Sequence, residues 1–291
     1  MTKKIGIILA GGQGTRLSPL TNVINKHFLP IYNKPMIYYP LSLLILAGIK
    51  NIILISDSES IKKFKELFKN LKYLGVDISY LIQKEPNGIP ECFLIAKDTI
   101  KDKKVILILG DNFFFGQNFP NEVSQALNLN KSGCTFFGHN VSNPENYAVV
   151  NFNKKKINIE EKPKKPKSNI VIPGLYIFDK KVSYFASKLK KSQRGELEIV
   201  DLINNYTKKN NYSFKIIKRG VTWLDMGSFN NLVATTNFVK NYEDRQNLMI
   251  GCIEEIAMRK GYINKKKLIK LSKNFNNNYG SYLSEISKEN D

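Results

Sequence analysis

The segment of the sequence that most directly suggests chemistry is a glycine-rich turn, GGQGTRL, at residues 11–17. It follows an apolar run at residues 5–10 that is typical of a buried strand. Glycines allow backbone N–H groups to approach an anion closely, and Arg16 adds a bidentate phosphate donor. The turn lacks the Gly-Lys-Ser/Thr ending of a Walker A loop, and Leu17 replaces the third glycine of a dinucleotide-binding fingerprint. On its own, the turn is as compatible with simple chain reversal as with phosphate binding.

Two aspartates stand where carboxylates could hold a metal ion. Asp111 follows a strongly apolar run at residues 105–109, and Asp225 follows a shorter expected strand at residues 222–224. Ligands bind beyond the carboxyl ends of the strands in open α/β sheets. Two carboxylates that converge there suit Mg²⁺, a hard ion that takes a few carboxylates together with phosphate oxygens and water. Either aspartate alone is equally compatible with a helix cap or a turn.

Two other polar positions have more than one interpretation. Lys162 follows Glu161, but the pair lies between two lysine-rich stretches and fits a solvated charged surface as well. Gln83 ends an expected strand, where its amide matches the donor and acceptor edge of thymine or uracil. A surface position explains Gln83 equally well, so these residues decide nothing by themselves.

The continuation of the glycine-rich turn points to a family. Residues 11–21 read GGQGTRLSPLT, Lys26 and Leu29-Pro30 follow, and residues 33–40 read NKPMIYYP. This run resembles the signature of the sugar-phosphate nucleotidyltransferases, and most closely that of the glucose-1-phosphate thymidylyltransferases. Similar motifs continue in order through nearly the whole chain: Gln83 with Glu85-Pro86 and Gly88, Leu109-Gly110-Asp111-Asn112, Glu161-Lys162-Pro163, Arg194-Gly195-Glu196-Leu197-Glu198-Ile199, Trp223-Leu224-Asp225 with Gly227, Glu243 with Arg245-Gln246, and Glu254-Glu255-Ile256-Ala257.

The resemblance implies a Mg²⁺-dependent reaction between a nucleoside triphosphate and a sugar 1-phosphate. A sugar-phosphate oxygen would attack the α-phosphorus in line and release pyrophosphate. The expected substrates are dTTP and glucose 1-phosphate, and the expected product is dTDP-glucose, for the synthesis of surface polysaccharide. Such a protein has to hold two polyanions and stabilise the charge on the pentacoordinate phosphorus, without a nucleophilic Ser or Cys.

The resemblance also implies roles for individual residues. The expected catalytic residues are Arg16, Lys26, Asp111, Lys162 and Asp225. Of these, Asp111 and Asp225 would bind Mg²⁺, while Arg16 and Lys26 would clamp the triphosphate. The expected nucleotide-binding residues are Gly11, Gly12, Gly14, Thr15, Arg16, Gln83 and Gly88. The expected sugar-binding residues are Tyr147, Glu161, Lys162, Gly174 and Tyr176.

Departures from the family pattern leave the exact substrates and any feedback regulation open. The family commonly has Lys-Gln-Leu-Leu-Pro, Gly-Leu-Ala-Gln-Ala, Tyr-Gly-Val-Val and Asn-Ile-Phe-Tyr-Gly-His. This chain has, in the same order, KHFLP at residues 26–30, GIPEC at residues 88–92, YAVV at residues 147–150 and NFFFGQ at residues 112–117. Two alternatives therefore stay open. One is a paralogous nucleotidyltransferase that uses another sugar 1-phosphate or UTP, and the other is a catalytically silent sugar-nucleotide sensor.

Alternating apolar and amphipathic segments must position these residues. Expected strands at residues 5–10, 51–56, 78–83 and 105–109 alternate with expected helices at residues 36–47 and 60–70 and from Pro90 onward. This order predicts a doubly wound, mostly parallel sheet. Short strands then become frequent, so we expect the sheet to become mixed: they lie at residues 135–139, 148–152, 157–161, 174–178, 214–217 and 222–224, with helices at residues 196–208 and 229–241. With the resemblance, the expectation is a Rossmann-like three-layer α/β/α nucleotidyltransferase fold.

The last fifty residues differ in character from the rest. We expect a catalytic domain at residues 1–240 and a helical C-terminal extension at residues 241–291 that serves oligomerisation or regulation. The resemblance implies a homo-oligomer, in this family usually a homotetramer. The sequence leaves open whether the Asn- and Lys-rich end from residue 264 is ordered.

Composition excludes several classes of protein. The chain has 291 residues, of which 42% are hydrophobic, too many for a disordered chain and enough for a real core. Its 45 Lys and Arg against 25 Asp and Glu give a formal charge of +20. The excess is mostly lysine spread along the chain, so we attribute it to biased composition and expect no nucleic-acid or membrane partner. Three widely spaced cysteines and the lack of a targeting segment favour a cytoplasmic location.

Overall fold

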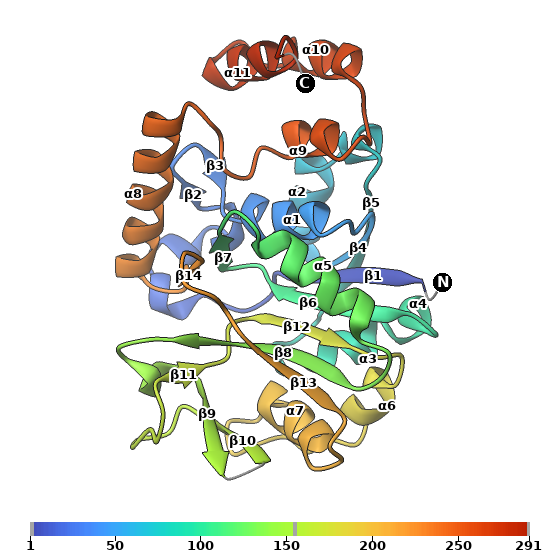
Figure 1. Ribbon diagram of the computed structural model, residues 1–291, viewed down its shortest axis with the longest axis vertical. Helices are drawn as coiled ribbons and strands as arrows, with labels where there is room; N and C mark the ends of the chain where they lie inside the picture. Colours follow the sequence, from blue (N-terminus) through green and yellow to red (C-terminus); the bar gives the residue numbers. More distant parts are fainter. Residues whose placement is uncertain (1–2, 154–155, 290–291) are drawn as a thin grey trace.

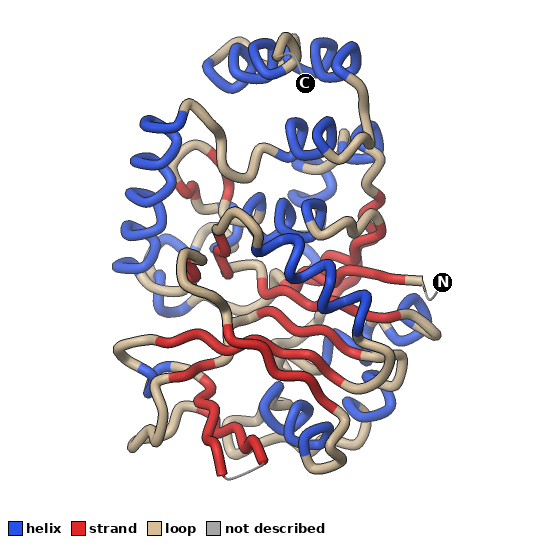
Figure 2. The backbone as a smooth tube through the Cα atoms, in the orientation of Figure 1, coloured by secondary structure: helices blue, strands red, loops and turns tan. Residues whose placement is uncertain are grey.

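The computed structural model describes residues 3–153 and 156–289 of the chain. Its centre is a large mixed sheet with helices on both faces (Figures 1 and 2). Neighbouring strands follow the order β10-β9-β11-β8-β12-β6-β1-β4-β5, and β13 also pairs with β8. The strands are β1 (Lys4–Leu9), β4 (Asn51–Ser56), β5 (Asp77–Ile82), β6 (Lys104–Leu109), β8 (Cys134–Asn140), β9 (Ala148–Asn153), β10 (Lys156–Glu161), β11 (Ile170–Val171), β12 (Leu175–Phe178) and β13 (Tyr212–Ile216).

The first four of these strands run parallel, as the alternation of apolar and amphipathic segments predicts. Ile8 of β1 lies opposite Leu54 of β4 on one side and Ile108 of β6 on the other. The strands are apolar on both faces because helices cover the sheet on both sides. Ile8 and Ile108 pack in one core cluster, whereas Ile7 and Leu107, one position along each strand, pack in the other.

Two layers of helices bury these faces. One face is covered by α1 (Tyr38–Leu46), α2 (Ser58–Leu67) and α5 (Phe119–Leu129). The other is covered by α3 (Glu91–Ile95), α4 (Lys97–Ile100), α6 (Val182–Ala186) and α7 (Ile199–Thr207). Beyond β6 the pairing turns antiparallel, since β12 is antiparallel to both β6 and β8. The predicted three-layer fold with a mixed sheet is therefore confirmed.

A small two-stranded sheet lies outside the central one. It joins β7 (Asn112–Phe115) to β14 (Thr222–Asp225) in antiparallel register, with Asp225 opposite Asn112. The expected strand at residues 222–224 therefore exists, but it does not belong to the central sheet. β7 was not predicted from the sequence, and neither was the short hairpin of β2 (Pro30–Ile31) and β3 (Lys34–Pro35).

Four helices complete the chain, and they extend the molecule beyond the sheet (Figure 1). They are α8 (Phe229–Gln246), α9 (Ile253–Arg259), α10 (Lys265–Ser272) and α11 (Asn278–Ile286). The boundary expected between residues 240 and 241 falls inside α8, which continues unbroken across it. The sequence left open whether the end from residue 264 is ordered, and its described part, residues 264–289, contains α10 and α11. Within residues 3–153 and 156–289, we found no helix that is long and apolar enough to cross a membrane.

Some expected helix boundaries shift by a few residues. The helix expected at residues 196–208 begins only at Ile199, because Glu198 has extended backbone angles and acts as its N-cap residue. The helix expected from Pro90 is two short helices, α3 and α4, with Ala96 between them. These shifts leave residues 194–198 as a loop over the cavity described next.

Candidate active site

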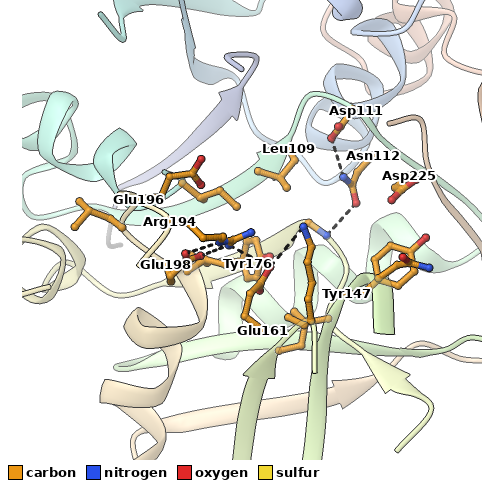
Figure 3. A pocket seen from close by; sticks show the side chains of 18 of the residues that line it. Leu109, Asp111, Asn112, Tyr147, Glu161, Tyr176, Arg194, Glu196, Glu198 and Asp225 are labelled. Carbon is orange, nitrogen blue, oxygen red and sulfur yellow. Dashed lines mark hydrogen bonds and ion pairs between the residues drawn. The ribbon is translucent and has the colours of Figure 1, made fainter. Parts of the chain in front are cut away.

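A cavity of about 240 Å³ opens where β6 ends and where β7, β12 and β14 come together. Figure 3 shows its side chains converging on a shared space from distant parts of the chain. The candidates for metal, phosphate and sugar binding meet here. Of the residues predicted from the sequence, the cavity is lined by Arg16, Asp111, Tyr147, Glu161, Lys162, Gly174, Tyr176 and Asp225.

Asp111 lies directly after β6, as expected, and its side chain is largely buried beside Lys26. Lys26 Nζ lies 2.5 Å from Asp111 Oδ2. Burial favours the neutral carboxyl, but the Lys26 ammonium and a hydrogen bond from Asn112 outweigh it and hold the pKa of Asp111 well below its ordinary value. Asp111 is therefore an anion at neutral pH, paired with one of the cations predicted to clamp the triphosphate.

Asp225 reaches the same place from β14. The antiparallel pairing sets it opposite Asn112, and the Met226 N–H donates to the Asp111 carbonyl oxygen at 2.7 Å. Asn231 Nδ2, from the first turns of α8, donates to Asp225 Oδ1. In the described part of the chain, no cluster of three or more His, Cys, Asp or Glu side chains forms a metal cage. Two carboxylates beside the predicted phosphate-binding cations fit Mg²⁺, which typically keeps phosphate oxygens and water as its remaining ligands.

Asn112 is the residue that ties these elements together. Its side chain is 3% exposed, and its Oδ1 accepts from the Gly174 N–H at 2.9 Å and from Trp223 Nε1 at 2.7 Å. Its Nδ2 donates to Asp111 Oδ1 at 3.1 Å. One buried amide thus connects β7, β12, β14 and the metal candidate. Asn112 was part of a quoted motif but had no predicted role; its place between Asp111 and an apolar run at residues 113–115 was the available signal.

The glycine-rich turn delivers Arg16 to this site. Gly14 has a left-handed backbone conformation, with φ of 62°, and it begins the 3₁₀ turn η1 (Thr15–Leu17). The Arg16 guanidinium then lies directly against Gly227, where a Cβ atom would collide with Nη2 and lie 3.7 Å from Asp111 Oδ2. The absence of a side chain at Gly227 therefore leaves room for the arginine in this position near Asp111.

The sugar-side candidates form a charged cluster on the opposite wall. Arg194 makes a two-point contact with Glu198, at 2.7 Å and 3.2 Å, and lies 3.6 Å from Glu161. Lys162 Nζ lies 3.9 Å from Glu161 Oε1, and its side chain is half exposed. Burial raises the pKa of Glu161, while Lys162 and Arg194 oppose that shift. Arg194 and Glu198 were quoted in a motif, and the structure adds them to the site.

The backbone at Lys162 is unusual. Its φ of 44° lies in the left-handed region, which costs free energy for a residue other than glycine and is common at functional sites. The Lys162 N–H donates to the Tyr147 carbonyl oxygen at 3.0 Å, and this bond holds the turn after β10 against the cavity wall. The strained turn directs Lys162 to the cavity rather than along the solvated lysine-rich surface around it.

Two tyrosines line the same cavity from different strands. Tyr176 belongs to β12, and burial raises its pKa, with the nearby Glu161 and Asp111 carboxylates adding to the effect. The ring of Tyr147 contacts Trp223 edge-on at a centroid distance of 5.2 Å. Burial also raises the pKa of Tyr147, with the Asp225 carboxylate next in importance. Both phenols therefore stay neutral and can act as hydrogen-bond donors.

A second cavity, of about 250 Å³, lies against the first residues of the glycine-rich turn. It is lined by Gly11, Gly12 and Gln83 from the predicted nucleotide set, and Gln83 is only 6% exposed. Its burial removes the alternative of a surface glutamine. The structure thus separates the candidates into two neighbouring cavities. Gly14, Thr15, Lys26 and Gly88 line neither of them.

Gly88 has a packing role that the sequence analysis missed. Its φ is 99°, and a Cβ atom there would collide with the backbone of Leu197. The Leu197 N–H donates to the Asn87 carbonyl oxygen at 2.8 Å. Gly88 therefore lets the loop beside Gln83 touch residues 194–198, and so it joins the two cavities.

Comparisons with known proteins place this site in a family. A sequence model described as nucleotidyl transferase matches residues 5–242. The chain belongs to the nucleotidyl transferase family. That match contains every residue that lines the two cavities.

Relatives within the nucleotidyl transferase family match almost end to end. The chain is 44% identical to a glucose-1-phosphate thymidylyltransferase of Neisseria meningitidis, over 98% of this chain and 99% of that protein. It is 41% identical to the enzyme of the same name from Mycobacterium tuberculosis, over 98% and 99%. A crystal structure from Bacillus anthracis, assigned as a glucose-1-phosphate thymidylyltransferase in complex with sucrose, has a TM-score of 0.74 and 35% identity, covering 81% of this chain and 94% of that one.

In this nucleotidyl transferase, the departure at His27 is structural. His27 is 1% exposed, its backbone N–H donates to Asn25 Oδ1 at 3.0 Å, and its Nδ1 lies 2.7 Å from the same oxygen. Burial, together with the neighbouring Lys26 ammonium, lowers the pKa of His27 to about 3. The ring packs against Gly110, where a Cβ atom would lie 2.7 Å from Nε2. The histidine supports the segment that carries Lys26 and is neutral at physiological pH.

Proposed function

We propose that this nucleotidyl transferase is a glucose-1-phosphate thymidylyltransferase. It transfers the thymidylyl group of dTTP to glucose 1-phosphate, giving dTDP-glucose and pyrophosphate for the synthesis of activated sugars. The observation that carries the proposal is the meeting of Asp111, Asp225 and Arg16 beside a cavity with a separate charged wall. That arrangement suits two polyanions held side by side, and full-length relatives of that name support the choice of substrates.

In the mechanism that we propose, the two substrates react directly. An oxygen of the sugar phosphate attacks the α-phosphorus of the triphosphate, and the bond between the α-phosphorus and the oxygen bridging to the β-phosphate breaks. Pyrophosphate leaves with that electron pair. Arg16 and Lys26 bind triphosphate oxygens and stabilise the negative charge that builds on them. No enzyme atom becomes covalently attached.

We propose Asp111 and Asp225 as the residues that hold Mg²⁺. When bound, the ion neutralises part of the phosphate charge and lowers the repulsion between the substrates. Asp111 is suited to this task because Lys26 and Asn112 keep it ionised. Asn231 donates a hydrogen bond to Asp225, and Asn112 donates one to Asp111. Such hydrogen bonds commonly orient the side chains that bind a metal.

Sugar recognition would fall to the opposite wall of the cavity. Lys162 would bind the phosphate of glucose 1-phosphate, and Glu161 would accept from a sugar hydroxyl. Tyr147, Gly174 and Tyr176 complete the proposed sugar-binding set, and Gly174 lets Leu109 and Asn112 pack closely beside the cavity, since a Cβ atom there would collide with both. Arg194 acts on Glu161 at 3.6 Å and so orients it.

The second cavity would hold the nucleoside. Gln83 and Gly88 are the proposed readers of the base, while Gly11, Gly12, Gly14 and Thr15 lie along the path to the phosphates. Gly11 and Gly12 line the cavity that Gln83 faces. A base in this cavity would extend its triphosphate along the turn toward Arg16.

We infer further that the enzyme acts as a cytoplasmic homotetramer. Its three cysteines are free and buried, which is typical of proteins from reducing compartments. We propose a catalytic unit at residues 1–240 and a helical extension at residues 241–291 that provides contacts between subunits. Light scattering should give four times the chain mass of 33.3 kDa, and a monomeric mass would overturn the assembly proposal.

A substrate panel tests the proposed activity. We expect pyrophosphate release to be fastest with dTTP and glucose 1-phosphate in the presence of Mg²⁺, compared with UTP, CTP, GTP and other sugar 1-phosphates. Asp111→Asn should reduce kcat by at least about a hundredfold, since it weakens metal binding and removes a fixed charge. Asp102→Asn, at an exposed position, is the matched control. If no pair of substrates releases pyrophosphate, the chain is a binding protein and the proposal fails.

A further inference from the structure

Glu91 is a half-buried neighbour of the base-reading candidate, and it departs from the glutamine that the family commonly has there. It opens α3, and its carboxylate contacts Gln83, which lines the second cavity. Glu91 Oε2 accepts from Gln83 Nε2 at 2.7 Å, and Glu91 Oε1 accepts from Asn87 Nδ2 at 3.0 Å. Both carboxylate oxygens are therefore engaged, and Asn87 fixes the carboxylate that holds Gln83.

This contact decides which way the Gln83 amide points. A carboxylate can only accept hydrogen bonds, so the amide must turn its NH₂ group toward Glu91. The second hydrogen of the same nitrogen is directed at the Gly88 carbonyl oxygen, 3.5 Å away. Both donor positions of Gln83 Nε2 are thus occupied from within the protein, and only the amide oxygen is left for a ligand.

The amide oxygen faces the place where a base would lie. A Cβ atom built on Gly11 would be 2.7 Å from Gln83 Oε1, so only glycine keeps that oxygen accessible. Gly11 and Gln83 line the same cavity, next to Gly12. A ring nitrogen that carries a hydrogen can donate to this oxygen, whereas a ring nitrogen with a lone pair would face it acceptor to acceptor.

We infer that Glu91 is a positioning residue for base choice, because it locks Gln83 as a hydrogen-bond acceptor. The inference rests on the proposed function and deepens it. Thymine and uracil carry N3–H and satisfy the locked oxygen. Cytosine has an unprotonated N3 and leaves Gln83 Oε1 opposed by a lone pair. The enzyme therefore rejects cytosine nucleotides through a residue that does not touch the base.

Glu91→Gln tests this inference. A glutamine at this position can donate as well as accept, so the Gln83 amide can turn over and offer its NH₂ group to cytosine. We expect the ratio of kcat/KM for dTTP to that for dCTP to fall by at least about tenfold, while kcat at saturating dTTP changes by less than about threefold. Glu66→Gln, an exposed position on α2, removes the same charge and should leave the ratio unchanged.

A double variant separates orientation from simple structural damage. In Gln83→Glu/Glu91→Gln the donor and acceptor are exchanged, and the carboxylate at position 83 can again only accept. The preference for dTTP over dCTP should return toward the wild-type ratio, even if overall affinity falls. An unchanged ratio in Glu91→Gln, or a double variant no more selective than the single one, would overturn the inference.

A binding measurement keeps this test independent of the proposed activity. Calorimetric titration with dTDP and dCDP should show the same change of preference between the wild type and Glu91→Gln. If the wild type releases no pyrophosphate but binds dTDP more tightly than dCDP in a Glu91-dependent way, the proposed function fails and the inference stands. If the wild type releases pyrophosphate but the preference for dTDP over dCDP is the same in Glu91→Gln, the proposed function stands and the inference about Glu91 fails.

Discussion

Asp111 and His27 lie close to Lys26, and both of their pKa values are lowered, for different reasons. For Asp111, burial acts in the opposite direction and is outweighed by the Lys26 ammonium. For His27, burial and the same ammonium act together and favour the neutral ring. Lys26 thus helps to keep an aspartate ionised and adds to the burial that keeps a histidine uncharged. Lys26 therefore influences the protonation states of both Asp111 and His27, and with them the net charge of the site.

The neutral state of His27 makes folding stability depend on pH. The pKa of an ordinary histidine is 6.5, and in the folded protein that of His27 is about 3. Since the unfolded chain binds the proton more readily, the stabilisation is complete above pH 6.5 and is lost as the pH falls toward 3. Between pH 7 and pH 5 this one residue should cost the wild type about 2 kcal/mol of unfolding free energy.

Urea unfolding at the two pH values measures this effect. His27→Gln cannot take up the proton, so its stability should fall by about 2 kcal/mol less than that of the wild type over the same interval. His139→Gln is the control, because His139 is only half buried and its pKa is lowered less strongly. Equal pH dependence in the wild type and in His27→Gln would show that His27 is not held neutral by the fold.

At the scale of elements, the two cavities are joined by a contact between two loops. Residues 194–198 carry Arg194 and Glu198 on the sugar side, and their backbone at Leu197 forms a parallel bridge with Gly88 on the nucleoside side. A glycine is required there because the backbones touch. The sites proposed for the two substrates are therefore mechanically linked through Gly88.

Gly88→Ala should damage both sites at once. We expect the KM values for dTTP and for glucose 1-phosphate to rise together, each by at least about fivefold, because the collision moves one loop away from the other. Gly261→Ala is the control, since Gly261 also has a positive φ, of 68°, but has open space around its Cα. Gly261→Ala introduces the same kind of backbone strain but no collision with another segment, so its KM values for dTTP and glucose 1-phosphate should stay at the wild-type level. A rise in only one KM would argue against the linkage.

The same elements show what the sequence could and could not predict. The strand expected at residues 51–56 is β4 to the residue, because its buried apolar run carries its own signal. The pairing of β7 with β14 could not be predicted from the sequence, because nothing in either short strand indicates a partner about a hundred residues away. Asp111 and Asp225 were found as candidates, but what brings them together is this pairing and the Asn112 hydrogen bonds. Glu91 was noted only as a departure, because its effect depends on the orientation of another side chain.

At the scale of the whole molecule, a buried ion pair fastens the C-terminal helices to the N-terminal part of the chain. Glu243 of α8 accepts from Lys34 Nζ at 3.0 Å and from Asn33 Nδ2 at 2.7 Å, in the hairpin of β2 and β3. It also accepts from the Ile250 N–H at 2.8 Å, in the segment that leads to α9. The Lys34 and Glu243 side chains are 2% and 5% exposed. The Glu243 carboxylate thus connects α8 to the β2–β3 hairpin and to the segment that leads to α9.

The extension is fastened to itself in a similar way. Tyr282 of α11 donates to Glu255 Oε2 at 2.5 Å, and Tyr279 donates to Glu254, so the last helix is bound to α9. Burial raises the pKa of Glu254, and the hydrogen bond from Tyr279 opposes that shift. The chain of contacts runs from the hairpin through Glu243 to α9 and α11.

Most of the basic residues behind the +20 net charge take part neither in these contacts nor in the proposed site. In the proposed site, only Arg16, Lys26 and Lys162 have assigned phosphate partners.

Breaking the Lys34–Glu243 pair on one side should therefore destabilise the whole molecule. Glu243→Leu leaves a buried ammonium without its counter-charge, which costs about 3–5 kcal/mol of unfolding free energy. Lys34→Met/Glu243→Leu removes both charges, and its loss should be well below the sum of the losses in Glu243→Leu and in Lys34→Met alone. Asp244→Leu, one position along α8, breaks only exposed contacts, the ion pair with Lys240 and a hydrogen bond from Tyr32 at 3.4 Å, and should leave the denaturation midpoint almost unchanged. Denaturant unfolding of the four variants decides the matter: additive losses, or a Glu243→Leu protein as stable as Asp244→Leu, would show that the pair does not fasten the C-terminal helices.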